Sequence, residues 1–137
     1  MAITVRRTES GRDDNSQGPQ YLYRGVTHAS PNIQTTAGKI VYVGVLPAYS
    51  LKQHTIVRMN TTFDGQMIIG TSSNTSAFFT TEDMPQTSPA DTYVSDRGYG
   101  TRSTVDVPVY VQLTTGTTVG GADIWISYLK GDATGST

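Results

Sequence analysis

The segment 104–132 carries the most regular pattern of the chain, with apolar residues at every second position in two runs. A stretch rich in threonine and glycine separates the runs. One face consists of Val105, Val107, Val109, Val111 and Leu113 in the first run and of Ala122, Ile124, Ile126 and Tyr128 in the second. Successive side chains of a strand point to opposite faces, so a period of two indicates a strand that is buried on one face. No part of the sequence shows helical spacing with suitable caps, and we expect an all-β fold.

The other strand signals recur at the spacing expected of an antiparallel β-sandwich. Residues 39–47 form an apolar run closed by a proline, and residues 54–63 alternate. Asp64-Gly65 favours a type I′ turn, which predicts that residues 66–70 return as the hairpin partner of 54–63. Pro108 cannot donate a ladder hydrogen bond, so it suggests that its strand lies at an edge or carries a bulge.

Composition and length agree with one β domain. Threonine, a β-branched residue favoured on half-exposed strands, occurs 22 times among 137 residues. We expect an N-terminal arm or edge region over residues 1–36 and the β-sandwich domain over residues 37–137. In the first region Ile3 and Val5 share one side of a short alternating run, and large apolar side chains follow at 21–23. This region is either an extended arm that docks on another surface or an edge strand with a surface loop of the same domain.

Charge and cysteine content exclude several classes of partner. The net charge is −1, so there is no basic excess to neutralise phosphates, and we expect no nucleic-acid partner. Without cysteine, the chain can form neither disulfides nor thiolate zinc sites. The N-terminal residues lack the apolar run of a signal peptide, and no later segment is suited to span a bilayer. We therefore expect synthesis in a cytosol and no membrane partner.

Catalytic and metal-binding chemistry finds little support. His28 and His54 lack partners at the spacing of an active site, and no familiar catalytic or phosphate-binding motif occurs. The carboxylates that a fold could bring together are Glu82, Asp83, Asp91, Asp96 and Asp106. Glu82 and Asp83 are adjacent, and neighbours in an extended segment point in opposite directions, so they would not flank one glycosidic bond. We expect no enzymatic activity, no metal and no other cofactor.

The segment DRGYG, residues 96–100, is the most distinctive exposed candidate. Glycines flank Tyr99, and Arg97 precedes them, so an aromatic side chain sits on a flexible loop. Tyrosine and arginine are enriched at interface hot spots, and we expect Arg97 and Tyr99 to contact a protein partner. The alternatives are a site that stacks on a sugar ring and an ordinary turn with a partly buried tyrosine.

Trp125 is the single tryptophan, and its position in the alternation places it opposite the apolar face of its strand. Tyr110 has the same relation to the preceding strand. The two side chains predict an exposed aromatic patch, which often marks an interface between subunits. The competing interpretation is that the N-terminal region covers the patch, for instance with Tyr21, Leu22 and Tyr23.

Several motifs follow one another in a characteristic order between residues 39 and 130. A strand ending in Leu-Pro-Ala at residues 46–48 leads into TIVRMNTTF at 55–63, and a glycine- and threonine-rich segment then precedes two last strands joined by a threonine-glycine linker. This order resembles small β-sandwich proteins of tailed-phage virions. The resemblance implies a capsid decoration (cement) protein with a jelly-roll-like sandwich. Residues 1–36 depart from the pattern.

The resemblance further implies a non-enzymatic virion protein on the capsid surface, made in the host cytoplasm. Proteins of this kind are often homotrimers, and they bind the outside of the lattice formed by the major capsid protein. An arm that orders on contact adds buried area, so we expect capsid contacts from Ile3, Val5, Arg6, Arg7 and Arg12. The alternatives are a carbohydrate-binding module, which would expose coplanar aromatics such as Tyr93 and Tyr99, and a receptor-binding component of a fibre or tail.

Overall fold

The structure is a computed structural model, and it describes residues 19–31, 33–34, 38–83, 92–114 and 116–131. Regular structure in this part of the chain is almost entirely β. The elements are β2 (Gln20–Thr27), β3 (Ile33–Gln34), β4 (Lys39–Leu46), β5 (Leu51–Thr61), β6 (Met67–Gly70), the 3₁₀ helix η1 (Thr81–Asp83), β7 (Thr92–Ser95), β8 (Val107–Leu113) and β9 (Gly121–Leu129). Among these residues there is no helix with the length and apolarity that crossing a membrane requires.

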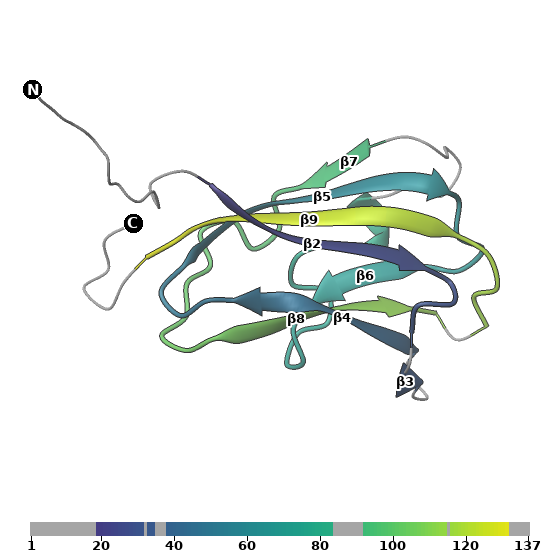
Figure 1. Cartoon of the computed structure of the whole chain (residues 1–137), viewed down its shortest axis with the longest axis horizontal. Helices are drawn as coiled ribbons and strands as arrows, with labels where there is room; N and C mark the ends of the chain where they lie inside the picture. Colours follow the sequence, from purple (N-terminus) through teal and green to yellow (C-terminus); the bar gives the residue numbers. More distant parts are fainter. Residues whose placement is uncertain (1–18, 32, 35–37, 84–91, 115, 132–137) are drawn as a thin grey trace, which may run out of the picture.

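The strands form two antiparallel sheets, one in the order β2-β9-β5-β7 and the other in the order β3-β4-β8-β6. Figure 1 shows the sheets as two layers that face each other. The segment around Phe79 bridges Ile69 at the outer edge of β6 and extends the second sheet there. In the first sheet strands from the two halves of the chain alternate, and in the second sheet β8 from the C-terminal half lies between β4 and β6, as in a jelly roll. The predicted all-β, jelly-roll-like sandwich is confirmed.

The core lies between the sheets, and the period-two pattern identified most of it. Val109, Val111 and Leu113 of β8 and Ile124 and Ile126 of β9 are fully buried. Side chains from both inner faces interdigitate in such a sandwich, which is why one side of each strand is apolar.

The prediction for the first alternating run is wrong at its start. Val105 is 63% exposed and precedes the first residue of β8. Next to it, Asp106 accepts a hydrogen bond from the backbone N–H of Ala48 at 2.8 Å. This bond holds the carboxylate against the turn that follows β4, so the chain joins the sheet only at Val107.

The predicted hairpin at Asp64-Gly65 is also wrong. β5 pairs with β7 and β9, whereas β6 pairs with β8, so the chain crosses from one sheet to the other at this point. Neither Asp64 nor Gly65 has the positive φ that a type I′ turn requires. Phe63 enters the core just before the crossing and is only 2% exposed.

Asp64 instead fastens the loop between β8 and β9. Its carboxylate accepts hydrogen bonds from the backbone N–H groups of Thr118 and Val119 at 2.9 and 3.1 Å and from the Thr118 hydroxyl at 2.5 Å. The hydroxyl and backbone bonds from Thr118 lower the pKa of Asp64 to about 2. The ionised side chain is therefore the form that holds the loop.

We expect Asp64→Ala to lower the melting temperature at neutral pH, because two backbone donors lose their acceptor. The pKa of Asp64 in the folded chain lies below its unfolded value. Its contribution is therefore fully present above about pH 4 and is lost as pH falls through about 2. Thermal melts at pH 7 and pH 2 check this. The wild type and the variant should differ at pH 7 and converge at pH 2, and an equal difference at both values would contradict the assignment.

Pro108 does not lie in an edge strand, because β8 runs between β4 and β6. The alternative expectation, a bulge, has a counterpart in β4, where the register with β8 shifts between Tyr42 and Gly44. Pro108 faces Val45 just beyond that shift and lies past the last residue that β6 pairs. A proline is tolerated there because one of its flanks has no strand partner in the described sheet.

The N-terminal region is divided in the structure. Gln20–Thr27 forms β2, an edge strand that pairs with β9 along its whole length. For these residues the edge-strand alternative is the one observed. Residues 1–18 lie outside the described residues, and so do the expected capsid contacts Ile3, Val5, Arg6, Arg7 and Arg12.

Candidate functional site

The loop after β7 is a compact turn that presents Tyr99. The N–H of Tyr99 donates to the carbonyl of Asp96 at 2.9 Å, and the N–H of Thr101 donates to that of Gly98 at 2.9 Å. Gly98 and Gly100 have φ values of 72° and 85°, a region in which residues with a side chain are strained. The two glycines therefore allow the chain to turn tightly and to project the tyrosine between them.

Lys52 anchors this loop from inside the protein. Its side chain has an exposed fraction of 0%, its Nζ donates to the carbonyl of Arg97 at 2.6 Å, and it lies 5.1 Å from the centre of the Phe78 ring. Burial lowers the pKa of Lys52 to about 8, although Asp96 and Asp83 attract its charge. Its backbone also bonds to Gly100 and Thr101, so the loop is held at both the side chain and the main chain.

The side chain of Arg97 is committed within the chain. Its Nε donates to Asp83 at 2.8 Å and its Nη2 to Glu82 at 3.1 Å. Partial burial opposes ionisation of Asp83, but bonds from Thr80, Arg97 and Ser95 outweigh it and lower the pKa. Glu82 and Asp83 lie in η1 rather than in an extended segment, and both contact one guanidinium, so the expected divergence of the pair is wrong.

Tyr99 is the exposed aromatic side chain of the loop, with 55% of its surface accessible. Its ring lies 5.4 Å from that of His54, and His54 Nδ1 lies 2.6 Å from Asp96 Oδ1. The three side chains form a small exposed group at the end of β7. The tyrosine is thus available to a partner, whereas Arg97 serves mainly to shape the loop.

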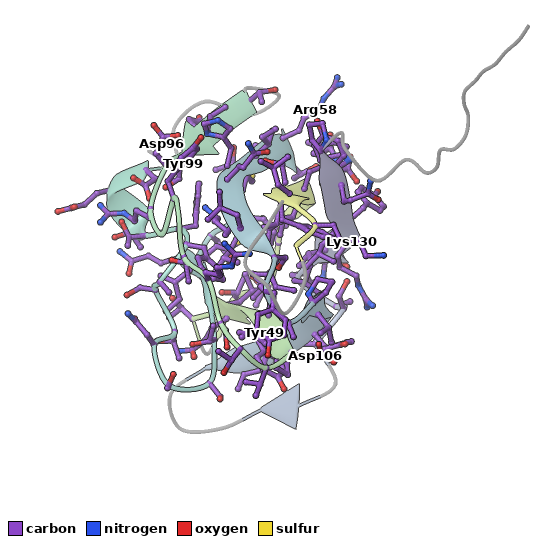
Figure 2. The ribbon with its side chains drawn as sticks, turned by 90° about the vertical axis from the view of Figure 1, so that its left-hand side faces the viewer. Tyr49, Arg58, Asp96, Tyr99, Asp106 and Lys130 are labelled. Atoms are coloured by element: carbon purple, nitrogen blue, oxygen red, sulfur yellow. The ribbon has the colours of Figure 1, made fainter. Side chains whose placement is uncertain are left out.

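The carboxylates in the described part of the chain do not gather into a reactive site. Figure 2 shows Asp96 beside Tyr99, with Asp106 in a different part of the molecule near Tyr49. Asp91 lies outside the described residues. Within the described ranges there is no group of three histidine or carboxylate side chains able to hold a metal ion. His28 lies in the turn after β2, and its buried Nδ1 has no hydrogen-bond partner among the residues that the structure describes.

The outer face of the first sheet carries a row of apolar side chains. Cross-strand register aligns Tyr23 with Trp125, Trp125 with Ile56, and Ile56 with Val94. We call these four residues the outer row. Tyr23 and Val94, at its ends, are 54% and 58% exposed. The rings of Tyr23 and Trp125 lie 5.3 Å apart and are inclined by 44°.

A polar side chain borders the outer row and fixes Tyr23. The Tyr23 hydroxyl donates to Asp123 Oδ1 at 2.5 Å, and Asn60 Nδ2 donates to Asp123 Oδ2 at 3.2 Å. These two bonds lower the pKa of Asp123, and the bond to Asp123 raises the pKa of Tyr23. The neutral phenol and the carboxylate therefore persist together over the ordinary pH range.

Tyr110 lies on the other side of the molecule. It belongs to β8 in the second sheet, where its ring is 5.8 Å from that of Tyr42. A shallow pocket of about 240 Å³ adjoins it, lined by Ile40, Thr71, Ser72, Thr75, Tyr110 and Gln112. Because Trp125 lies in the first sheet, the prediction of one patch shared by Tyr110 and Trp125 is wrong.

The pair of coplanar aromatics expected of a carbohydrate-binding module is not formed either. Tyr93 points inward from β7 and packs against the core, whereas Tyr99 is exposed on the loop. One alternative from the sequence is that the N-terminal region covers Trp125, for instance with Tyr23. The structure places Tyr23 in contact with Trp125, but beside it, as its cross-strand neighbour in the same sheet.

No family profile and no curated protein matches the sequence. Two solved structures share the fold. A chain of the cyanophage Pam1 capsid asymmetric unit superposes with a TM-score of 0.64 at 12% identity, over 90% of this chain and 92% of that one. A chain from the capsid of Ralstonia phage GP4 superposes with a TM-score of 0.54 at 13% identity, over 93% of each chain. The fold of this chain therefore also occurs in chains of these two phage capsid structures.

Proposed function

We propose that this chain is a non-enzymatic structural protein of a tailed-phage virion, a decoration (cement) protein that binds the outside of the major capsid protein lattice. The observation that carries the proposal is the fold. It is similar over at least nine-tenths of the chain to chains in two phage capsid structures. The sequence resemblance of residues 39–130 to small virion sandwiches points the same way, and it rests on different features.

The described surface supports a role in contact rather than in chemistry. The carboxylates are separated or engaged by Arg97, and several exposed apolar side chains lie on strands of the two sheets, namely Tyr21, Tyr23, Tyr42 and Val94. Apolar rows and an aromatic loop are suited to a protein interface. Affinity there comes from a few anchoring side chains, and the contacts around them exclude water. Tyr99, Tyr110 and Trp125 are the described residues that we assign to such contacts.

The resemblance implies three copies in the assembled unit. In a closed ring of three copies, each contact joins one surface of a copy to a different surface of the next copy. The outer face of the second sheet, which carries Tyr110, and the loop that presents Tyr99 are two such different surfaces.

We expect the purified chain to sediment with empty shells of the major capsid protein from the same genome and to raise their melting temperature. Binding adds stability because the ligand favours the assembled state. Deleting residues 2–12 should lower occupancy, whereas deleting residues 133–137 serves as the control. Saturable sugar binding without binding to shells would favour the carbohydrate-binding alternative. Undiminished occupancy after the N-terminal deletion would remove the arm from the proposal and leave the sandwich as the contact.

A further inference from the structure

The first sheet has a second row beside the outer row, and it is polar. Cross-strand register aligns Gly25 with Asp123, Asp123 with Arg58, and Arg58 with Thr92. Asp123 and Arg58 lie on the two central strands, β9 and β5. Arg58 is exposed, and Asp123 is partly exposed. The outer face thus has a negative and a positive group at equal positions on either side of its midline.

The outer row has a matching symmetry about the same midline. Its aromatic side chains, Tyr23 and Trp125, lie on β2 and β9, and its aliphatic side chains, Ile56 and Val94, lie on β5 and β7. Consider a second copy turned by 180° about an axis that runs along the strands, midway between β9 and β5. Each aromatic side chain of one copy then faces an aliphatic side chain of the other, Trp125 on Ile56 and Tyr23 on Val94.

The same rotation pairs the charges. Arg58 of each copy faces Asp123 of the other, so the contact contains two opposite-charge pairs and no like-charge pair along this row. Stacked sheets keep their strands within about 30° of each other, so the match is best at the centre of the face. The central positions are those of Trp125, Ile56, Asp123 and Arg58. A surface that matches itself in this way fits a two-fold contact.

The area of the face is adequate for a weak dimer. Four strands spaced about 4.8 Å apart and about eight residues long cover roughly 500 Å² per copy, or about 1,000 Å² for the pair. Specific interfaces begin at about this size, and those at the lower end are transient. The contact should therefore form at micromolar to submillimolar concentrations and dissociate on dilution.

From this geometry we infer that the outer face of β2-β9-β5-β7 binds a second copy of this chain through a two-fold contact centred on Trp125 and Ile56. We infer another copy as the partner because the face is complementary to itself: aromatic side chains face aliphatic ones, and positive groups face negative ones. A ring of three copies would not use this contact internally, so it would join two such rings.

Sedimentation velocity over a range of concentrations tests the inference. The mass of the sedimenting species should double as the concentration rises, either from one chain to two or from one ring of three chains to two rings. Val94→Asp should lower the association constant at least about tenfold, because it buries a charge against Tyr23. Val105→Asp is the matched control, since Val105 is similarly exposed and lies outside the face. Equal effects of the two substitutions, or a mass that never doubles, would overturn the inference.

A charge exchange tests the two-fold geometry itself. Arg58→Glu makes both central charges negative, and Asp123→Lys makes both positive, so each variant alone should associate at least about tenfold more weakly. Mixed in equal amounts, they should form heterodimers as readily as the wild type, because each positive group then faces a negative one. Circular dichroism verifies that each variant is folded. If Asp123→Lys does not fold, the test is whether Arg58→Glu alone weakens association. If both variants fold and their mixture does not associate, the proposed axis is overturned.

Fluorescence of Trp125, the only tryptophan, separates this occupant from others. The inference predicts a blue shift of its emission as the concentration rises, lost in Val94→Asp. A blue-shifted emission that does not change with concentration and is abolished by deleting residues 2–8 would mean that the N-terminal segment covers the face. That result, or a shift seen only with capsid shells, would overturn the second copy as the occupant.

Discussion

The Gly120→Ala variant should lose at least about 3 kcal/mol of unfolding free energy, because two separate costs add at this position. Gly120 has a φ of 139°, which a residue with a side chain adopts only with strain. An added Cβ would also collide with the ring of Phe63 and lie 2.8 Å from its Cα. Phe63 is buried in the core at the crossing between the sheets, so neither its ring nor its backbone can move away cheaply.

Gly116→Ala is the matched control for this substitution. Gly116 lies in the same loop between β8 and β9 and has a φ of 94°, but a Cβ there meets no other atom within 4 Å. It should therefore cost only the backbone strain, about 1 kcal/mol. Urea unfolding followed by Trp125 fluorescence measures both variants. Equal losses would show that the contact with Phe63 has no part in the effect.

The folded protein should gain about 2 kcal/mol of stability between pH 7 and pH 9.5 through Lys52. Burial lowers the pKa of this ammonium group to about 8 in the folded state, against 10.5 for the unconstrained group. Below pH 8 both states hold the proton, and folding buries a charge. Between about 8 and 10.5 the unfolded chain binds more protons than the folded one, so stability rises with pH in this window. Urea midpoints at successive pH values measure the slope.

The Lys52→Met variant should abolish this rise while keeping a side chain of similar length. It removes the buried charge but also leaves the Arg97 carbonyl without its donor, and these changes oppose each other at pH 7. Lys39→Met is the control, since Lys39 also donates to a carbonyl, that of Thr117, but is only partly buried. A slope that survives in Lys52→Met would assign the pH dependence to another group.

The strands that were predicted well are those with one face in the core. In β8 and β9 every inward position is apolar, because the facing sheet excludes water along most of the strand. The alternation does not indicate where a strand ends. The end depends on contacts such as the hydrogen bond from the backbone of Ala48 to Asp106. This is why the alternation suggested that Val105 belongs to the core while the chain there is still in a turn.

The errors share a dependence on long-range structure. Asp64-Gly65 indicates a change of direction, but which sheet receives the next strand depends on how the whole chain folds back. The hairpin was therefore wrong although a turn is present. Likewise, Tyr110 and Trp125 have the same position in their own alternations, and only the strand order shows that their faces are opposite.

Lys52 shows why the anchor of the loop escaped sequence analysis. From Thr55 to Met59 the odd-numbered residues point inward, and that period places Lys52 outside. The register between β5 and β9 shifts between Lys52 and Thr55, so the lysine turns into the protein. The sequence alone therefore cannot distinguish a lysine on an exposed face from a buried one. The register shift in β5 decides which of the two Lys52 is.

Quantitative mass spectrometry of purified phage particles tests most directly whether this jelly roll is a decoration protein. If it is, the chain is present in filled heads in a constant ratio to the major capsid protein, and it remains after tails have been detached. Absence of the chain from heads, or its recovery with the detached tails alone, would contradict the account.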